Sequence, residues 1–459
     1  MAEICENKHK NYTKYNTFWK KCRDTVEGQE AVHTAGISYL PKLGGQTTVE
    51  YNAYVLRALF FNATGRTLDA LSGMLFRKSP QVTLPTPAKE WEKNIDLAGL
   101  PLLSFTEKVA EEVISVGRCG VLVDMPTERS DIITAEEASK ANMRPFASLY
   151  KAENILDWQS SVINGARILS YILLDEIVEQ AQENGSYKEI EQRRILDIDD
   201  TGYRVRLFRK DDSGWALVET IYPKSNNSNL SSIPFVFFNP QDVTQELTKP
   251  PLLDMVNVNL SHYRTSADLE HGSHYTALPT PVITGHEITE GSNGLSIGSG
   301  EAWVISSPEA KAFYLEFKGD GLGTLQSLLA SKENMMAVLG ARILSADKKA
   351  AEAAETESIR RSGENSVLAS MAGAISSGMT IVLEIMTEWA KISGDVSIQL
   401  NRDYLPAGMT SQQLTATVGA WQGGAISEKE LFENLKNGEL IVDSKTFEEH
   451  QENIFRYLR

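Results

Sequence analysis

The stretch that decides the fold covers residues 250–344 and contains two helical segments separated by a glycine-rich interval. The first segment, residues 250–275, is PPLLDMVNVNLSHYRTSADLEHGSHY, and the second, residues 322–344, is LGTLQSLLASKENMMAVLGARIL. In the second segment large apolar side chains recur at helical spacing and form one stripe. These side chains are Leu325, Leu328, Leu329, Met336, Leu339 and Ile343. Strand-like runs occupy residues 279–285, 301–305 and 313–317. The sequence therefore predicts a small β unit inserted between two helices.

Residues 1–249 predict helices first and an antiparallel sheet afterwards. Helices are expected at 49–62, where Val49, Ala53 and Leu56 are helically spaced, and at 102–116. Strand-like runs then follow at 145–150, 166–174, 192–196, 203–208 and 215–219. The run 203–208 alternates strictly, and Asp211-Asp-Ser-Gly214 has the composition of a hairpin turn. This order of elements predicts an α+β fold.

The chain after residue 344 predicts mainly helices. Residues 345–356 consist largely of Ala and charged residues and lack a large apolar anchor, which favours a mobile loop or a frayed helix. A long helix is expected at 357–391, and three short helices at 411–422, 427–437 and 444–457. Residues 366–386 carry a single charge over about the length of a membrane span. Their Ser, Gly and Thr content instead favours a helix packed closely against protein, so no membrane association is expected.

Composition limits the class of function. The chain has 459 residues and a formal net charge of −16. Proteins that grip DNA through its phosphates usually carry a basic surplus, so DNA binding over the whole surface is disfavoured. The acidic charge is compatible with a protein that DNA slides past without binding tightly. Cys5, Cys22 and Cys119 are scattered, which indicates neither a disulfide framework nor a zinc site. The N-terminal residues lack the apolar core of a secretion signal.

The sequence gives no positive case for a common catalytic or cofactor site. There is no G-x-x-x-x-G-K-S/T phosphate loop and no H-E-x-x-H motif. The letters G-x-S-x-G occur at residues 294–298, inside the glycine-rich interval and not on a strand-to-helix elbow. The glycines at 291, 294, 298 and 300 do not follow a strand-to-helix fingerprint, so a flexible loop is expected there. His262, His271 and His274 lie on the first helical segment without a cysteine nearby, which favours ordinary helix residues over a metal site. We therefore expect no enzyme activity, no cofactor and no metal.

Several runs, kept in order along the chain, resemble the bacteriophage portal proteins (head-to-tail connectors) of the short-tailed-phage type. The runs are 39–46 (YLPKLGGQ), 51–58 (YNAYVLRA), 66–78 (RTLDALSGMLFRK), 153–158 (ENILDW), 250–264 (PPLLDMVNVNLSHYR), 339–343 (LGARI) and 357–361 (ESIRR). No single run has a chemical signature, so the resemblance depends on the series. It implies a structural virion protein that forms a ring, usually of twelve subunits, at one capsid vertex.

The resemblance also implies a division of the chain. Residues 1–249 correspond to a wing, 250–275 and 322–344 to two stem helices, and 276–321 to a β clip inserted between them. Residues 345–356 correspond to a tunnel loop, 357–392 to a long wing helix, and 393–459 to a short helical crown. The expected role is a conduit for double-stranded DNA during packaging and ejection, located in the virion and, during assembly, in the host cytoplasm.

Sites and partners follow from the same resemblance. The lining of the channel is expected to be mainly acidic, which would let DNA slide through. Lys348 and Lys349 on the tunnel loop are expected to be the few basic side chains near the DNA. The clip, with His286, Glu287, Glu290 and Asn293, is expected to face the terminase large subunit and later the head-tail adaptor or tail proteins. Leu325, Leu328, Met336 and Leu339 are expected to pack stem helices of neighbouring subunits in the homo-oligomer. The major capsid protein is the remaining expected partner.

Two alternatives remain open at the level of sequence. One is another structural component of the head or tail. The other is a nucleic-acid enzyme of the packaging apparatus, which the missing phosphate loop disfavours.

Overall fold

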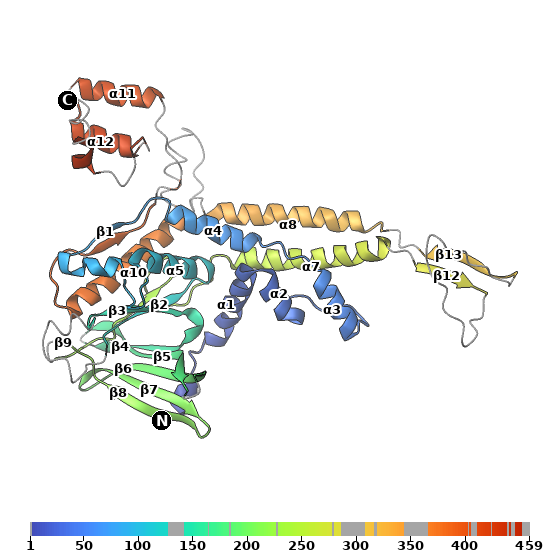
Figure 1. The fold of residues 1–459 in the computed structure, drawn as a ribbon, viewed down its shortest axis with the longest axis horizontal. Helices are drawn as coiled ribbons and strands as arrows, with labels where there is room; N and C mark the ends of the chain where they lie inside the picture. The colour runs from blue at the N-terminus through green and yellow to red at the C-terminus, as the bar shows by residue number, and fades with distance from the viewer. Residues whose placement is uncertain are drawn as a thin grey trace. The chain divides into compact units, whose positions relative to one another are not determined.

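The computed structural model describes residues 2–126, 142–163, 165–182, 185–225, 228–277, 280–285, 308–315, 319–343, 366–402, 404, 411–423, 425–437, 440–441 and 446–451. The chain divides into two compact units. Unit 1 comprises Met1–Val26, Thr64–Asp254 and Leu339–Arg459, and unit 2 comprises Glu27–Ala63 and Met255–Val338. Helices and antiparallel sheets occur together (Figure 1), which confirms the predicted α+β class.

The centre of unit 1 is a three-stranded antiparallel sheet packed against two helices. The strand order is β11 (Phe235–Phe238), β2 (Cys119–Asp124), β3 (Phe146–Lys151). Helices α5 (Leu102–Ser115) and α10 (Val367–Trp389) pack on β2, and α10 also packs on β11. All four residues of β11 are buried, as expected for a short apolar run without alternation.

A five-stranded meander forms the second sheet of unit 1. Its strands pair antiparallel in sequence order: β4 (Ile155–Ile163), β5 (Ala166–Ala181), β6 (Tyr187–Asp199), β7 (Gly202–Asp211) and β8 (Gly214–Ile221). One hydrophobic cluster joins it to β2 and β11 through Trp158 and Phe237. A second cluster joins it to α1 (Tyr12–Glu27) through Trp19. The predicted hairpin turn is confirmed, with the Asp211 carboxylate accepting a hydrogen bond from the Ser213 backbone N–H at 2.8 Å.

The remaining described elements of unit 1 are short. They are η1 (Ala2–Glu6), α4 (Ala63–Leu75), η3 (Thr86–Glu92), η4 (Ala152–Asn154), the strand pairs β1 (Gln81–Thr83) with β14 (Ser397–Gln399) and β9 (Lys224–Ser225) with β10 (Ser228–Asn229), and the helices α11 (Ser411–Gln422) and α12 (Glu428–Asn437).

Unit 2 is built on two long helices. Helices α7 (Leu253–Ala277) and α8 (Leu322–Ile343) run side by side (Figure 1), joined by a polar contact between His262 and Glu333. In the chain between them lies the hairpin of β12 (Thr280–Thr284) and β13 (Lys311–Leu315). The unit also contains α2 (Gln29–Ala35), η2 (Gly36–Ser38) and α3 (Thr48–Arg57). Both predicted long helices are confirmed.

Several sequence-based expectations differ from the structure or extend beyond the residues it describes. Strand β4 was not expected. Helix α3 ends at Arg57, although a helix to residue 62 was expected. Helix α10 begins at Val367, and residues 357–365 of the predicted long helix lie outside the described residues. The strand run expected at 301–305 also lies outside them.

Helix α10 has the length and composition of a membrane span. Among the described helices, it alone is long and apolar enough to cross a membrane. However, 61% of its most apolar 18-residue stretch is buried inside the structure. Leu368, Ile375 and Leu383 are fully buried there, the pattern of a helix at the centre of a core.

The close approach of α10 to β11 requires a glycine. A Cβ atom on Gly378 would lie 2.4 Å from Cε1 of Phe238. We expect Gly378→Ala to lower the free energy of unfolding by about 1–3 kcal/mol, because a well-packed core accommodates an added methyl poorly. Urea denaturation measures the change. Gly73→Ala in α4 is the matched control: its Cβ meets nothing within 4 Å, so it should be neutral or stabilising. Equal effects of the two substitutions would contradict the packing argument.

Candidate functional site

The contact surface between α7 and α8, here called the seam, contains the buried Met336 together with hydrogen bonds of Lys332 and His262. Met336 on α8 is 1% exposed, and Gly272 on α7 lets α8 approach, since a Cβ there would lie 2.8 Å from Cδ2 of Leu322. Lys332 donates hydrogen bonds to the Ser261 carbonyl oxygen at 3.0 Å and to the Thr265 hydroxyl at 2.5 Å. The seam therefore holds the two helices in one register through directional bonds as well as by burial.

His262 is buried in this seam. Its Nε2 lies 3.3 Å from Oε1 of Glu333, and its Nδ1 has no hydrogen-bond partner among the described residues. Desolvation lowers the pKa of His262 below its usual value, and the hydrogen bond with Glu333 opposes that shift. Among the described residues no group of three or more His, Cys, Asp or Glu side chains is placed to hold a metal ion. His262 is thus part of the helix packing.

Helix α3 covers α7 on another face. The Tyr54 hydroxyl donates a 2.6 Å hydrogen bond to Asp268, and its ring meets His271 edge to face at 5.1 Å. A capping box fixes the start of α3, with Thr47 and Glu50 each bonding the other's backbone N–H. Helix α3 is therefore anchored through its two buried tyrosines, Tyr51 and Tyr54.

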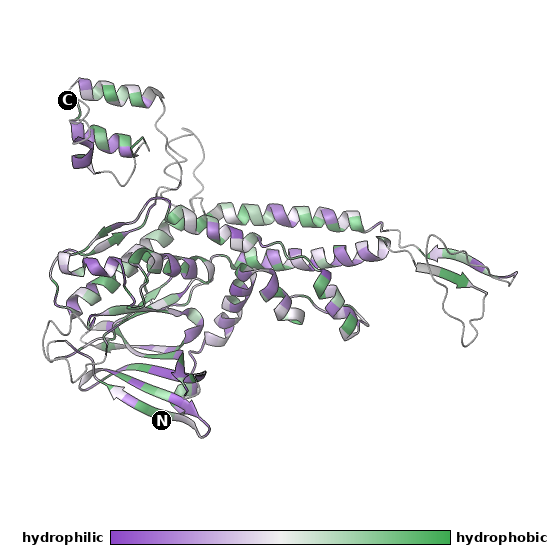
Figure 2. Ribbon diagram, in the orientation of Figure 1, coloured by the Kyte–Doolittle hydropathy of each residue, from purple (hydrophilic) through white to green (hydrophobic). Residues whose placement is uncertain are grey.

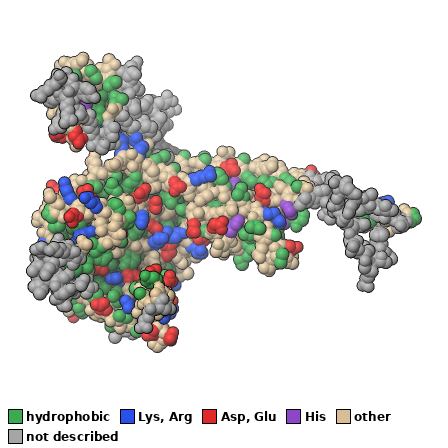
Figure 3. Space-filling model, in the orientation of Figure 1, with side chains coloured by type: hydrophobic (Ala, Val, Ile, Leu, Met, Phe, Trp, Pro, Cys, Tyr) green, Lys and Arg blue, Asp and Glu red, His purple; other side chains and the backbone are tan. Residues whose placement is uncertain are grey.

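Two helices of unit 2 expose apolar faces. On α8, Leu328 is 45% exposed, and Met335 and Val338 are each 54% exposed. On α3, Val49 is 79% and Leu56 82% exposed. Figure 2 shows hydrophobic residues along the whole of α8, and Figure 3 shows hydrophobic side chains at its surface. Large apolar side chains gathered at such exposure are typical of a surface that another protein covers.

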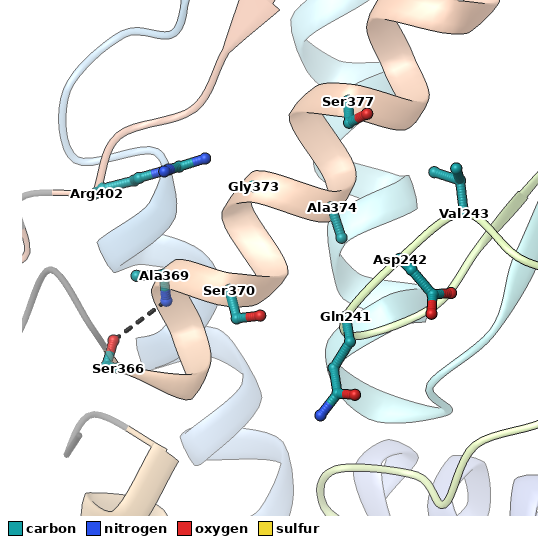
Figure 4. Close-up of a pocket in the computed structure, with 10 residues that line it drawn as sticks. All are labelled: Gln241, Asp242, Val243, Ser366, Ala369, Ser370, Gly373, Ala374, Ser377 and Arg402. Atoms are coloured by element: carbon teal, nitrogen blue, oxygen red, sulfur yellow. Dashed lines mark hydrogen bonds between the residues drawn. The ribbon is translucent and has the colours of Figure 1, made fainter. Parts of the chain in front are cut away.

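A groove follows the exposed face of α10 in unit 1. Its volume is about 530 Å³. Small residues of α10 form its floor, with Arg402 on one side and Gln241, Asp242 and Val243 on the other (Figure 4). Ser366 caps the helix, since its hydroxyl accepts a 3.1 Å hydrogen bond from the Ala369 N–H. The groove lining combines the hydroxyls of Ser370 and Ser377 with the charged side chains of Asp242 and Arg402.

The structure places the residues predicted from sequence as follows. Leu328 is exposed, Met336 is buried, and Leu325 and Leu339 are half-buried. Lys348 and Lys349 lie outside the described residues, as do His286, Glu287, Glu290 and Asn293.

The exposed faces were not predicted from the sequence. Val49 and Leu56 were noted only for their helical spacing, and the buried face of α3 carries tyrosines. Met335 and Val338 were left out of the apolar stripe of α8. The signal available was the seven-residue spacing of Leu328 and Met335 beside the stripe already chosen.

Comparison with known proteins gives a partial family match and remote likenesses to solved structures, of which two are described below. Residues 251–390 match a family described as "Domain of unknown function (DUF4055)", which is less than half of the chain. No curated protein matches the chain. A structure titled "Neck of native GTA particle computed with C12 symmetry" is 10% identical, with a TM-score of 0.35, and the match covers 81% of this chain and 89% of that one. A second, "Neck of empty GTA particle computed with C6 symmetry", is 10% identical, with a TM-score of 0.38 and coverage of 88% and 97%.

Proposed function

We propose that this chain is a structural component of a phage head-tail connector, and specifically its portal subunit. Identical copies form a ring, usually of twelve, at one capsid vertex, and double-stranded DNA passes through the channel during packaging and ejection. The observation that carries the proposal is the pair α7–α8 with a β hairpin inserted in the chain between them, at the segment whose sequence most resembles the portal proteins. In this proposal α7 and α8 are the stem helices.

The lateral contact in the ring is proposed to use the exposed apolar face of α8, residues Leu328, Met335 and Val338. Met336 is buried inside the chain, so it supports the helix on which this face lies. Because copies in a ring meet through two different surfaces, each copy needs a second apolar face. The face of α3 with Val49 and Leu56 meets that requirement within the same unit.

The other partners are proposed on the sequence resemblance. The clip segment 276–321, with His286, Glu287, Glu290 and Asn293, is proposed to dock the terminase large subunit and afterwards the adaptor or tail proteins. The capsid protein surrounds the ring. The net charge of −16 supports a mainly acidic channel, because duplex DNA, with one negative charge per about 1.7 Å, slides past an acidic wall and is held by a basic one.

The double variant Lys348→Glu/Lys349→Glu tests the proposed tunnel loop. Removing the two positive charges and adding two negative ones should weaken the hold on packaged DNA. The measurement is the fraction of particles that retain DNA after assembly. The double variant Lys89→Glu/Lys93→Glu reverses two exposed lysines in and directly after η3 and is the control for a general charge effect. Unchanged packaging and retention in the tunnel-loop variant would remove the role assigned to these lysines.

Electron microscopy of the purified chain separates this proposal from its alternatives. Rings with a central hole support a portal, whereas shells or trimeric fibres support another head or tail component. DNA-stimulated ATP hydrolysis by the purified chain would instead support a packaging enzyme.

A further inference from the structure

Four side chains of unit 1 form a continuous stack. The His9 and Trp158 rings lie nearly parallel, 17° apart, with their centroids separated by 4.1 Å. The Arg118 guanidinium carbon is 4.4 Å from the ring centres of both Trp158 and Phe237. The Trp158 ring therefore has an imidazole and a cation as immediate neighbours.

The positive charge of Arg118 is stabilised by the Trp158 and Phe237 rings. Arg118 is fully buried, and no described carboxylate hydrogen-bonds to it. Its Nη1 donates long bonds of 3.3 Å to the carbonyl oxygens of Gln245 and Glu246, while Nε and Nη2 have no partner among the described residues. Desolvation lowers the pKa of Arg118 to about 9, which leaves it charged at neutral pH. The π faces of Trp158 and Phe237 are thus a main source of its stabilisation.

His9 fastens the N-terminal segment to the edge of β4. Its backbone N–H donates a 2.9 Å hydrogen bond to the Leu156 carbonyl oxygen. Its Nδ1 lies 3.4 Å from the Asn11 backbone nitrogen and accepts that N–H, which requires an unprotonated Nδ1. On either side, Arg193 donates to the Cys5 carbonyl oxygen and Tyr12 to the Glu153 carbonyl oxygen. His9 is therefore central to this attachment.

Charged groups of both signs face His9. Arg118, on the turn before β2, and Lys10 beside it oppose protonation. Asp157 on β4 and Glu246 in the segment before α7 favour protonation. Burial is the largest influence and, with the two cations, lowers the pKa of His9 below its usual value of 6.5. His9 is therefore neutral at physiological pH in the attached state.

We propose that His9 is an acid-sensitive latch, whose protonation releases η1 and the start of α1 from the edge of β4. Protonation of Nδ1 removes the acceptor for the Asn11 N–H. It also places a second positive charge beside the Trp158 ring, which already stabilises the Arg118 cation. Because the pKa of His9 is lowered in the attached state, His9 contributes its full stabilisation of that state at pH values above its usual pKa. That support is lost as the pH falls from about 6.5 towards the lowered value. Release would free the backbone edge of β4, an element prone to pair with another strand, and uncover the buried thiol of Cys5.

Hydrogen exchange of the full-length chain tests the latch. Exchange of the peptide covering residues 2–12 is followed by mass spectrometry at pH 7.5 and 5.5 and corrected for the intrinsic pH dependence of exchange. One proton per opening event allows a change of up to about tenfold per pH unit. We therefore expect protection of this peptide to fall several-fold at pH 5.5, while protection of β7 in the same sheet stays constant.

Two variants make the outcome specific to His9. His9→Phe keeps an aromatic stack on Trp158 without a titrating group, and His9→Gln keeps an acceptor for the Asn11 N–H. Both should show the same protection of residues 2–12 at the two pH values. Labelling of Cys5 by a thiol reagent active at acidic pH should rise at pH 5.5 in the unmodified chain alone. Equal pH dependence in the unmodified chain and both variants, or constant protection in the unmodified chain, would overturn the proposal.

Discussion

The double variant Leu328→Glu/Met335→Glu is expected to abolish ring formation and leave a folded, unassembled chain. Both side chains are about half exposed in the isolated chain, so the substitutions should change its stability by no more than about 0.5 kcal/mol each. In a packed lateral contact the same carboxylates would be buried without partners. That costs several kcal/mol at every interface of a ring. Sedimentation velocity measures the change in mass.

The control is Gln326→Glu, which adds one negative charge, half that of the double variant, at an exposed position on a different face of α8. It should assemble like the unmodified chain. Thermal denaturation of the double variant should show an intact folding transition. If the double variant still forms rings, this face of α8 is not the lateral contact. If Gln326→Glu also prevents assembly, the effect arises from charge in general.

Arg23→Met is expected to destabilise unit 1 by about 3–5 kcal/mol, the cost of leaving buried charges unpaired. Arg23 on α1 donates to Glu112 on α5 at 2.6 Å and to Glu153 in η4 at 2.5 Å. Desolvation alone would lower the pKa of Arg23, but hydrogen bonds with both carboxylates raise it above its usual value. Without the guanidinium, two partly buried carboxylates remain side by side. Urea denaturation of samples in the same oligomeric state measures the loss.

Lys20→Met on the same helix provides the control for Arg23→Met. Lys20 pairs with Asp24 at 2.9 Å but is largely exposed, so its removal should cost about 0.3–0.5 kcal/mol. A deficit of Arg23→Met that matches that of Lys20→Met would contradict the assigned role of Arg23.

The long helices and most strands were predictable because their patterns are local. The alternation of residues 203–208 is enough to indicate β7, and the apolar spacing of residues 322–344 is enough to indicate α8. Strand β4 was missed because its alternation is interrupted: the register with β5 shifts between Ile155 and Asp157 and again between Gln159 and Ser160. Such bulges break the two-residue period on which strand prediction depends.

The end of α3 was unpredictable for a different reason. Apolar residues continue through Leu59 and Phe60, so local spacing favours a longer helix. Distant groups instead bind this backbone: His33 contacts the Ala58 carbonyl oxygen at 2.9 Å, and Asn259 donates to that of Phe61 at 2.8 Å. These tertiary bonds stabilise an extended chain where propensity favours a helix.

The candidate contact face was only partly predictable. Leu328 and Met336 both satisfy helical periodicity, and the sequence does not reveal which of two neighbouring stripes α7 covers. The structure resolves this by burying Met336 and exposing Leu328 with Met335.

A three-dimensional reconstruction of the purified, assembled chain by electron microscopy decides whether it forms the proposed channel. We expect a closed ring of identical copies whose bore admits a DNA duplex, with α8 of each copy contacting its neighbour and acidic side chains predominating on the wall. A particle without a through-going bore, a bore narrower than a duplex, or a mainly basic wall would contradict that proposal.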